Sequence, residues 1–168
     1  MLKLSDCPTS ISTREAQCLS RWAASRRVVE GGALFGGSTI LLAEVAAHVI
    51  SIDKHSGYTA PTFKRFKSNL LRAGVSSRVA TVVGDAPTEL KKLKRGAVDF
   101  TFLDLTGDYL LTKHALEATS SPLVGVHDMG RVCCMGVEKA ILELGYEILE
   151  HVDTLVICRK SSGPQSSY

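Results

Sequence analysis

Long hydrophobic runs are absent from this sequence. The longest apolar stretch of the 168 residues, Ile40 to Ile50, is interrupted by Glu44 and His48. It falls short of the roughly 18 to 20 apolar residues that a helix needs to cross a bilayer. Residues 1–13 contain one lysine and no apolar centre, which is unlike a secretory signal. These absences predict a soluble protein with no membrane partner.

A strong excess of charge of one sign is also lacking. Twenty Lys and Arg residues against 17 Asp and Glu residues give a net charge of +3, too small a field to indicate a nucleic-acid partner. The two basic clusters, within residues 64–67 and 91–95, have helical spacing, which is typical of solvated outer helix faces. We therefore do not expect nucleic acid as a partner.

The cysteines form no recognisable metal or redox motif. There are five, at positions 7, 18, 133, 134 and 158, without a C-x-x-C pair or a histidine at zinc-ligand spacing. An odd number of such cysteines predicts reduced thiols in a cytoplasmic compartment. The length predicts a single domain over residues 1–160. The polar segment 161–168 has nothing to bury and is predicted to be a disordered tail.

Strand-like and helix-like patterns alternate along the chain. The expected helices are 13–25, 38–47, 61–73, 87–95, 109–118 and 132–144, and the expected strands are 27–30, 48–53, 79–83, 98–103, 123–127, 146–150 and 154–158. Strands joined by helices pair in parallel through right-handed crossovers. Only three residues separate the last two strands, too few for a crossover, so these two must pair antiparallel. The pattern predicts a doubly wound α/β fold whose mostly parallel, seven-stranded sheet ends with an antiparallel strand and carries helices on both faces.

Ionisable residues follow each of the first five expected strands, at the sheet edge where open α/β folds bind ligands. They are Glu30, Asp53, Asp85, Asp104 and the pair His127-Asp128. After the first strand, a dinucleotide site would need glycine at the position that Leu34 occupies, so NAD is disfavoured. The spacing Glu30-x-Gly32-x-x-x-Gly36 instead suits a ligand with an ammonium group and no pyrophosphate. Its carboxylate would hold the amine, and the bare loop would let a nucleoside approach.

The other two early acids fit a nucleoside as well. Asp53 lies where an acid can accept hydrogen bonds from both ribose hydroxyls. Asp85 could accept one from an adenine amino group, or it could cap the helix that Ala86-Pro87 begins; both roles are compatible. A solvated carboxylate at a strand end is the alternative for Glu30 and Asp53. Because both acids and the glycine loop between them suit the same ligand, we favour a ligand-binding role for Glu30 and Asp53.

This order of motifs resembles the class I S-adenosylmethionine-dependent methyltransferases over residues 11–160. The resemblance rests on Glu30-x-Gly32-x-x-x-Gly36, Ile52-Asp53, Gly84-Asp85, Phe102-Leu103-Asp104 and the final antiparallel pair. Segments 36–39, 98–104 and 126–128 are similar to small-molecule O-methyltransferases, including catechol-type enzymes and enzymes that modify sugars and macrolides. The resemblance implies a Rossmann-like fold and a methyl transfer from S-adenosyl-L-methionine to a hydroxyl group of a small molecule.

The resemblance also implies a role for each cofactor-binding position. Glu30 and the loop residues Gly31, Gly32, Ala33 and Gly36 would surround the methionine moiety, whose carboxylate Ser38 would meet at a helix N-terminus. Asp53 and Lys54 would lie at the ribose, and Gly84 and Asp85 near the adenine. Asp104 would lie near the transferred methyl group, or would merely cap the loop that follows it.

A hydroxyl acceptor needs a base, and three residues are candidates for the catalytic role: His127, Asp128 and Asp104. His127 titrates near neutrality, and Asp128 could accept a proton or orient the acceptor. On a regular strand, these two neighbours would point to opposite faces. A structural histidine bonded to the backbone is the alternative for His127.

Metal-dependent members carry an Asp, a second Asp and an adjacent Asn at this edge. Here Asp104 and Asp128 match, but the third position is Met129, whose thioether is a poor ligand for Mg²⁺. We therefore expect no catalytic metal.

Two other functions stay open. An RNA or protein methyltransferase is the second interpretation. It ranks below the first because the sequence Asp104-Leu105-Thr106-Gly107 lacks the motif with which base-methylating relatives hold a flipped base. A non-catalytic cofactor-binding or regulatory domain is the third, because so short a chain leaves little room for a substrate lid. The sequence allows a homo-oligomer without indicating one.

Overall fold

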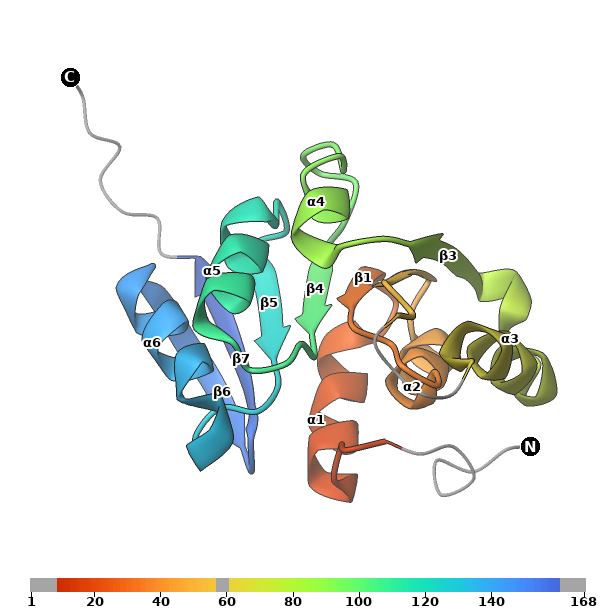
Figure 1. Ribbon diagram of the computed structural model, residues 1–168, viewed down its shortest axis with the longest axis horizontal. Helices are drawn as coiled ribbons and strands as arrows, with labels where there is room; N and C mark the ends of the chain where they lie inside the picture. Colours follow the sequence, from red (N-terminus) through yellow and green to blue (C-terminus); the bar gives the residue numbers. More distant parts are fainter. Residues whose placement is uncertain (1–8, 57–60, 161–168) are drawn as a thin grey trace.

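The computed structural model describes residues 9–56 and 61–160. Their centre is a seven-stranded sheet with the order β3-β2-β1-β4-β5-β7-β6 (Figure 1). The strands are β1 (Arg27–Gly31), β2 (His48–Asp53), β3 (Val79–Val83), β4 (Phe100–Leu103), β5 (Leu123–Val126), β6 (Tyr146–Val152) and β7 (Leu155–Lys160). The first five pair in parallel, and β7 is antiparallel to both of its neighbours. The predicted doubly wound fold with one antiparallel strand near the C-terminus is confirmed.

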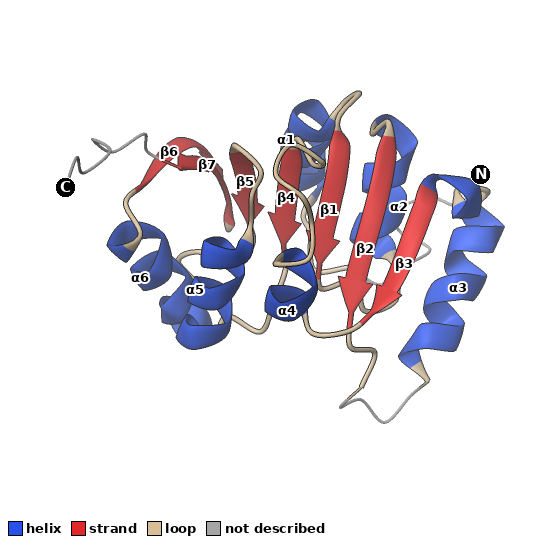
Figure 2. Ribbon diagram, turned by 90° about the horizontal axis from the view of Figure 1, so that it is seen from above, coloured by secondary structure: helices blue, strands red, loops and turns tan. Residues whose placement is uncertain are grey.

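Helices cover both faces of the sheet (Figure 2). The helices α1 (Thr13–Ala23), α2 (Gly37–Val45) and α3 (Thr62–Ala73) pack on one face, and α4 (Ala86–Leu90), α5 (Tyr109–Ala118) and α6 (Met135–Glu143) pack on the other. The side chains of successive β1 residues alternate between the two faces of the sheet. Val28 packs in the core under α1 to α3, and Val29 packs in the core under α4 to α6. The central strands are therefore buried on both sides, as expected for parallel strands.

Some element boundaries differ from those expected. The helix predicted over 87–95 ends at Leu90, because residues 91–95 are mostly exposed lysine and arginine with only Leu93 packed against the core. The strand predicted from residue 98 begins at Phe100. A 3₁₀ turn, Val132–Cys134, precedes α6 where a continuous helix was expected.

The described residues also bear on three broader predictions. None of the helices in 9–56 and 61–160 is both long enough and apolar enough to cross a bilayer. The basic side chains of residues 64–67 and 91–95 are exposed, as predicted for solvated faces. Cysteines 18, 133, 134 and 158 are free thiols. The predicted disordered tail, 161–168, lies outside the described residues.

A pair of leucines on α5 tests the two-sided core. Leu116 is fully buried, whereas Leu110 on the same helix is 57% exposed. Leu116→Ala should lower the free energy of unfolding by about 2 to 5 kcal/mol, because it leaves a cavity. The matched control Leu110→Ala should change it by less than about 0.5 kcal/mol. Urea denaturation measures both changes; equal losses would contradict this packing.

Candidate functional site

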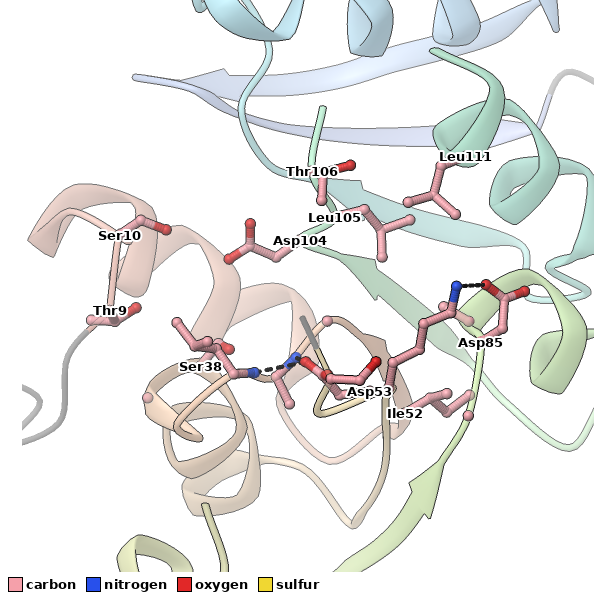
Figure 3. Close-up of a pocket in the computed structure, with 18 residues that line it drawn as sticks. Thr9, Ser10, Ser38, Ile52, Asp53, Asp85, Asp104, Leu105, Thr106 and Leu111 are labelled. Atoms are coloured by element: carbon pink, nitrogen blue, oxygen red, sulfur yellow. Dashed lines mark hydrogen bonds and ion pairs between the residues drawn. The ribbon is translucent and has the colours of Figure 1, made fainter. Parts of the chain in front are cut away.

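A cleft opens at the carboxyl ends of the parallel strands, where β1 and β4 lie side by side and the strand order reverses (Figure 3). Its volume is about 350 Å³, within the range of small-molecule sites. Its lining residues come from the N-terminal segment and from the ends of β1, β2, β3 and β4: Thr9, Ser10, Gly32, Ala33, Leu34, Gly37, Ser38, Ile52, Asp53, Lys54, Ser56, Gly84, Asp85, Ala86, Asp104, Leu105, Thr106 and Leu111. The structure thus brings together the ends of four of the five strands that the sequence pointed to; the pair after β5, His127-Asp128, is not in the lining.

Backbone forms one wall of the cleft, between β1 and α2. Gly32 has a φ of +91°, and a Cβ atom there would lie 2.0 Å from the carbonyl oxygen of Asp104. Gly36 has a φ of +90° and precedes the first residue of α2. Only glycine fits the first of these positions, because a side chain would collide with backbone that cannot move aside. The spacing of the two glycines therefore reflects the shape of the loop.

Asp53 holds this loop in place. Its Oδ2 accepts hydrogen bonds from the backbone N–H groups of Ala33 and Leu34, at 2.7 and 2.8 Å, and its Oδ1 accepts one from that of His55, at 2.6 Å. Burial alone would raise the pKa of Asp53, but these three donors outweigh it and lower the pKa below its ordinary value. A carboxylate accepts about four hydrogen bonds, so this one keeps room for a further donor from the cleft.

Lys54 and Asp85 form an ion pair across the cleft mouth. Lys54 Nζ lies 2.8 Å from Asp85 Oδ1. Asp85 also precedes α4 and accepts hydrogen bonds from the backbone N–H and the hydroxyl of Thr88. The hydrogen bonds from Lys54 and Thr88 lower the pKa of Asp85. The capping role that was one of two alternatives is present, and the side chain still borders the cleft.

Glu30 does not line the cleft; it lies fully buried beneath it. Its carboxylate accepts hydrogen bonds from the hydroxyls of Ser38, at 2.5 Å, of Ser51, at 2.9 Å, and of Thr39. Burial raises the pKa of Glu30 to about 7, against the opposing effect of these hydroxyls. Gly31 and Gly36 are likewise outside the lining, so these three predicted positions can act on a ligand only through their neighbours.

Of the three candidate catalytic residues, only Asp104 borders the cleft. The side chain of His127 is fully buried behind it, with Nδ1 3.2 Å from Asp104 Oδ1 and 3.3 Å from Asp128 Oδ1. Asp128 has a φ of +70° and follows the end of β5 at Val126. Because the strand has already ended, the two neighbours face a common point, and the alternation of a regular strand does not apply.

Comparison with known proteins adds to this geometry. No family model matches the chain. The catechol O-methyltransferase of Mycobacterium tuberculosis is 40% identical over 83 residues, which are 48% of this chain and 36% of that protein. The matched segment thus spans about a third of the length of that relative.

Solved structures settle the fold. The O-methyltransferase TomG from Streptomyces achromogenes, in complex with S-adenosylmethionine, superposes with a TM-score of 0.66 at 21% identity, over 90% of this chain and 82% of TomG. The fold is that of the class I methyltransferases. Precorrin 8W decarboxylase from Methanobacterium thermoautotrophicum has it too, with a TM-score of 0.66, 18% identity and coverage of 94% of each chain. The methyltransferase fold therefore does not by itself decide the reaction.

Ligand atoms of Asp104, His127 and Asp128 lie within 4.8 Å of one another, a spacing that metal sites also show. The surroundings do not fit Mg²⁺, which prefers oxygen ligands and keeps several waters. One of the three groups is a buried imidazole, and the guanidinium of Arg131 already pairs with Asp128 at 3.0 Å. Met129 is buried in the core. The two acids of this cluster thus already contact basic side chains, those of His127 and Arg131.

Several residues that line the cleft were not predicted from the sequence. Thr9 and Ser10 reach the cleft from the segment before α1, and Leu105, Thr106 and Leu111 reach it from the region after β4. Short polar and apolar side chains in these segments carry no motif, so only the fold reveals them. Glu15 forms a capping box with Ser12 at the start of α1 and lies buried next to His127, a contact that no sequence pattern indicates.

The buried carboxylate of Glu30 makes stability depend on pH. Its pKa is about 7 in the folded protein and near 4.5 when unfolded. The folded state therefore holds the proton more tightly, and stability should fall by about 3 kcal/mol as pH rises from 4.5 to 7. Glu30→Gln should remove this part of the pH dependence, measured by urea denaturation at both pH values.

The exposed Glu44 on α2 provides the control. Glu44→Gln should keep the pH dependence of the unmodified protein. An unchanged pH dependence in Glu30→Gln would show that Glu30 is not the titrating group.

Proposed function

We propose that this protein transfers a methyl group from S-adenosyl-L-methionine to a hydroxyl group of a small molecule. The observation that carries the proposal is the charge of the cleft. Among the described lining residues, there are three carboxylates, those of Asp53, Asp85 and Asp104, and one cationic side chain, Lys54, which already pairs with Asp85. A cleft with this balance suits a ligand with positive charge, and S-adenosylmethionine carries a sulfonium and an ammonium group.

The geometry supports a distinct place for each part of the cofactor. Asp53 keeps acceptor capacity for a ribose hydroxyl, and Gly84, Asp85 and Leu105 border the region expected to hold the adenine. Ser38 lies in the first turn of α2, where the methionine carboxylate would meet the positive end of the helix dipole. Glu30 would act on the cofactor through Ser38, whose hydroxyl it holds.

The acceptor would bind beside Asp104, toward Thr9 and Ser10 (Figure 3). Methyl transfer is an in-line displacement: the acceptor oxygen bonds to the methyl carbon as the carbon–sulfur bond breaks. The hydroxyl proton would pass to Asp104, the one candidate base that borders the cleft. The products are S-adenosylhomocysteine and a methyl ether.

The sequence match to a catechol O-methyltransferase supports a small-molecule acceptor over a nucleic acid. The exposed basic clusters on α3 and after α4 contribute no residue to the cleft lining, which further disfavours an RNA substrate. A cytoplasmic location remains an expectation from the free thiols.

Binding of S-adenosylhomocysteine tests the cofactor site. Isothermal titration calorimetry should detect this ligand and no binding of NAD. Asp53→Ala should weaken binding at least tenfold, or about 1.4 kcal/mol, because it removes a ribose acceptor and releases the loop backbone. Glu44→Ala, on the exposed side of α2, should bind like the unmodified protein. Absence of any binding by the unmodified protein would reject the proposal.

Methyl transfer to a panel of catechols and sugars tests the catalytic assignment. Asp104→Asn should reduce kcat by about 100-fold or more, the usual contribution of a general base. The affinity for S-adenosylhomocysteine should change little, and calorimetry on the same variant serves as the control. Full activity of Asp104→Asn would contradict the role of this carboxylate, and cofactor binding without any turnover would support the non-catalytic alternative.

A further inference from the structure

A buried carboxylate lies behind His127, on the side away from Asp104. Glu15, in the first turn of α1, is 2% exposed, and its Oε2 lies 3.5 Å from His127 Nε2. Its Oε1 accepts hydrogen bonds from the backbone N–H and the hydroxyl of Thr154, at 2.8 and 2.7 Å, and its Oε2 accepts one from the N–H of Ser12, at 2.7 Å. Two distant segments, the start of α1 and the β6–β7 turn, thus hold this carboxylate in place.

Hydrogen-bond acceptors face both nitrogens of the His127 ring. Nδ1 lies 3.2 Å from Asp104 Oδ1 and 3.3 Å from Asp128 Oδ1. Nε2 lies near Glu15 and 3.3 Å from the hydroxyl oxygen of Thr154, whose own proton is directed at Glu15. A nitrogen that meets only acceptors must carry a proton. The described surroundings therefore favour a proton on each nitrogen of the ring.

We propose that Glu15 is a positioning residue for the candidate base. The negative charge of Glu15 Oε2, 3.5 Å from Nε2, stabilises the protonated ring. In this state Nδ1–H donates to Asp104 and orients its carboxylate toward the cleft. The catalytic consequence rests on the proposed function, but the arrangement of the ring does not. Glu15 itself touches no lining atom; it acts through His127.

Every charged group that faces the ring bears on its protonation. These groups are Glu15 from α1, Asp104 from the end of β4, and Asp128, which Arg131 partly neutralises. Burial alone would lower the pKa of His127, but the hydrogen bond and charge of Asp104, with the charges of Asp128 and Glu15, raise it above its ordinary value. The pKa of Glu15 is lowered to about 2, because the donors from Ser12 and Thr154 and the charge of His127 outweigh its burial. Glu15 therefore stays ionised over the range in which His127 titrates.

Ring titration followed by NMR tests this inference without any substrate. The signal of His127 is assigned with His127→Asn and followed from pH 5 to 9 in the unmodified protein, in Glu15→Gln and in Ser12→Ala. Glu15→Gln should lower the pKa of the ring by at least about half a unit, since it removes one nearby negative charge. Ser12→Ala weakens the helix cap but keeps the Glu15 charge, so the ring pKa should not change.

The inference is overturned if folded Glu15→Gln titrates like the unmodified protein. Should Glu15→Gln fail to fold, Glu15→Ala takes its place, because it also removes the negative charge beside Nε2. This variant should also lower the ring pKa, and an unchanged value again overturns the inference.

Methyl-transfer kinetics, where an acceptor is found, provide a second readout. Glu15→Gln should lower kcat and move the alkaline limb of its pH profile to lower pH, with the affinity for S-adenosylhomocysteine unchanged. If activity falls but the alkaline limb of the kcat pH profile stays at the same pH, the role of Glu15 is merely structural and the inference is overturned. A ring pKa that shifts in a protein without methyl transfer would refute the proposed function and leave the role of Glu15 toward His127 standing.

Discussion

The cleft depends on the hydrogen bonds between the carboxylate of Asp53 and the loop that joins β1 to α2. This carboxylate accepts hydrogen bonds from the backbone N–H groups of Ala33 and Leu34 in the loop that follows the neighbouring strand β1. The loop passes so close to the carbonyl of Asp104 that only glycine fits at position 32. One side chain at the end of β2 therefore ties down the loop that lines the cleft. The donors that hold it also lower the pKa of Asp53, which favours the ionised form that they bind.

Two buried glutamates near this cleft differ in charge because of what surrounds them. Glu30 meets only hydroxyl groups of Ser38, Thr39 and Ser51, and burial raises its pKa to about 7. Glu15 meets two backbone N–H groups and a histidine, and its pKa falls to about 2. For Glu30 the cost of burial dominates, whereas for Glu15 the hydrogen-bond donors and the charge of His127 outweigh it. One carboxylate can thus be neutral under the loop between β1 and α2 while another stays charged behind the candidate base.

The parts of the structure that depend on periodicity and chain length were predictable. The alternation of strands and helices required parallel pairing, and three residues between the last two strands required an antiparallel pair. The helix boundaries depend on local packing: after Leu90, only Leu93 of residues 91–95 packs against the core, and the helix ends. In the site, Asp53, Asp85 and Asp104 lie where their strand ends indicated.

Contacts between segments far apart in the chain could not be predicted from the sequence. Whether Glu30 faces the cleft or the interior depends on which hydroxyls α2 and β2 bring beneath the loop. The meeting of Glu15 with Thr154 and His127 joins positions far apart in the chain, and no spacing rule connects them. The burial of His127 likewise follows from the packing of α1 and the β6–β7 turn over the end of β5.

Backbone amide NMR during a titration with S-adenosylhomocysteine tests the central claim most directly. The account predicts concerted shifts for the amides of residues 32–38, 53–54, 84–86 and 104–106, with those of β6 unaffected. Shifts confined to another surface, or none at saturating ligand, would contradict a nucleoside site in this cleft.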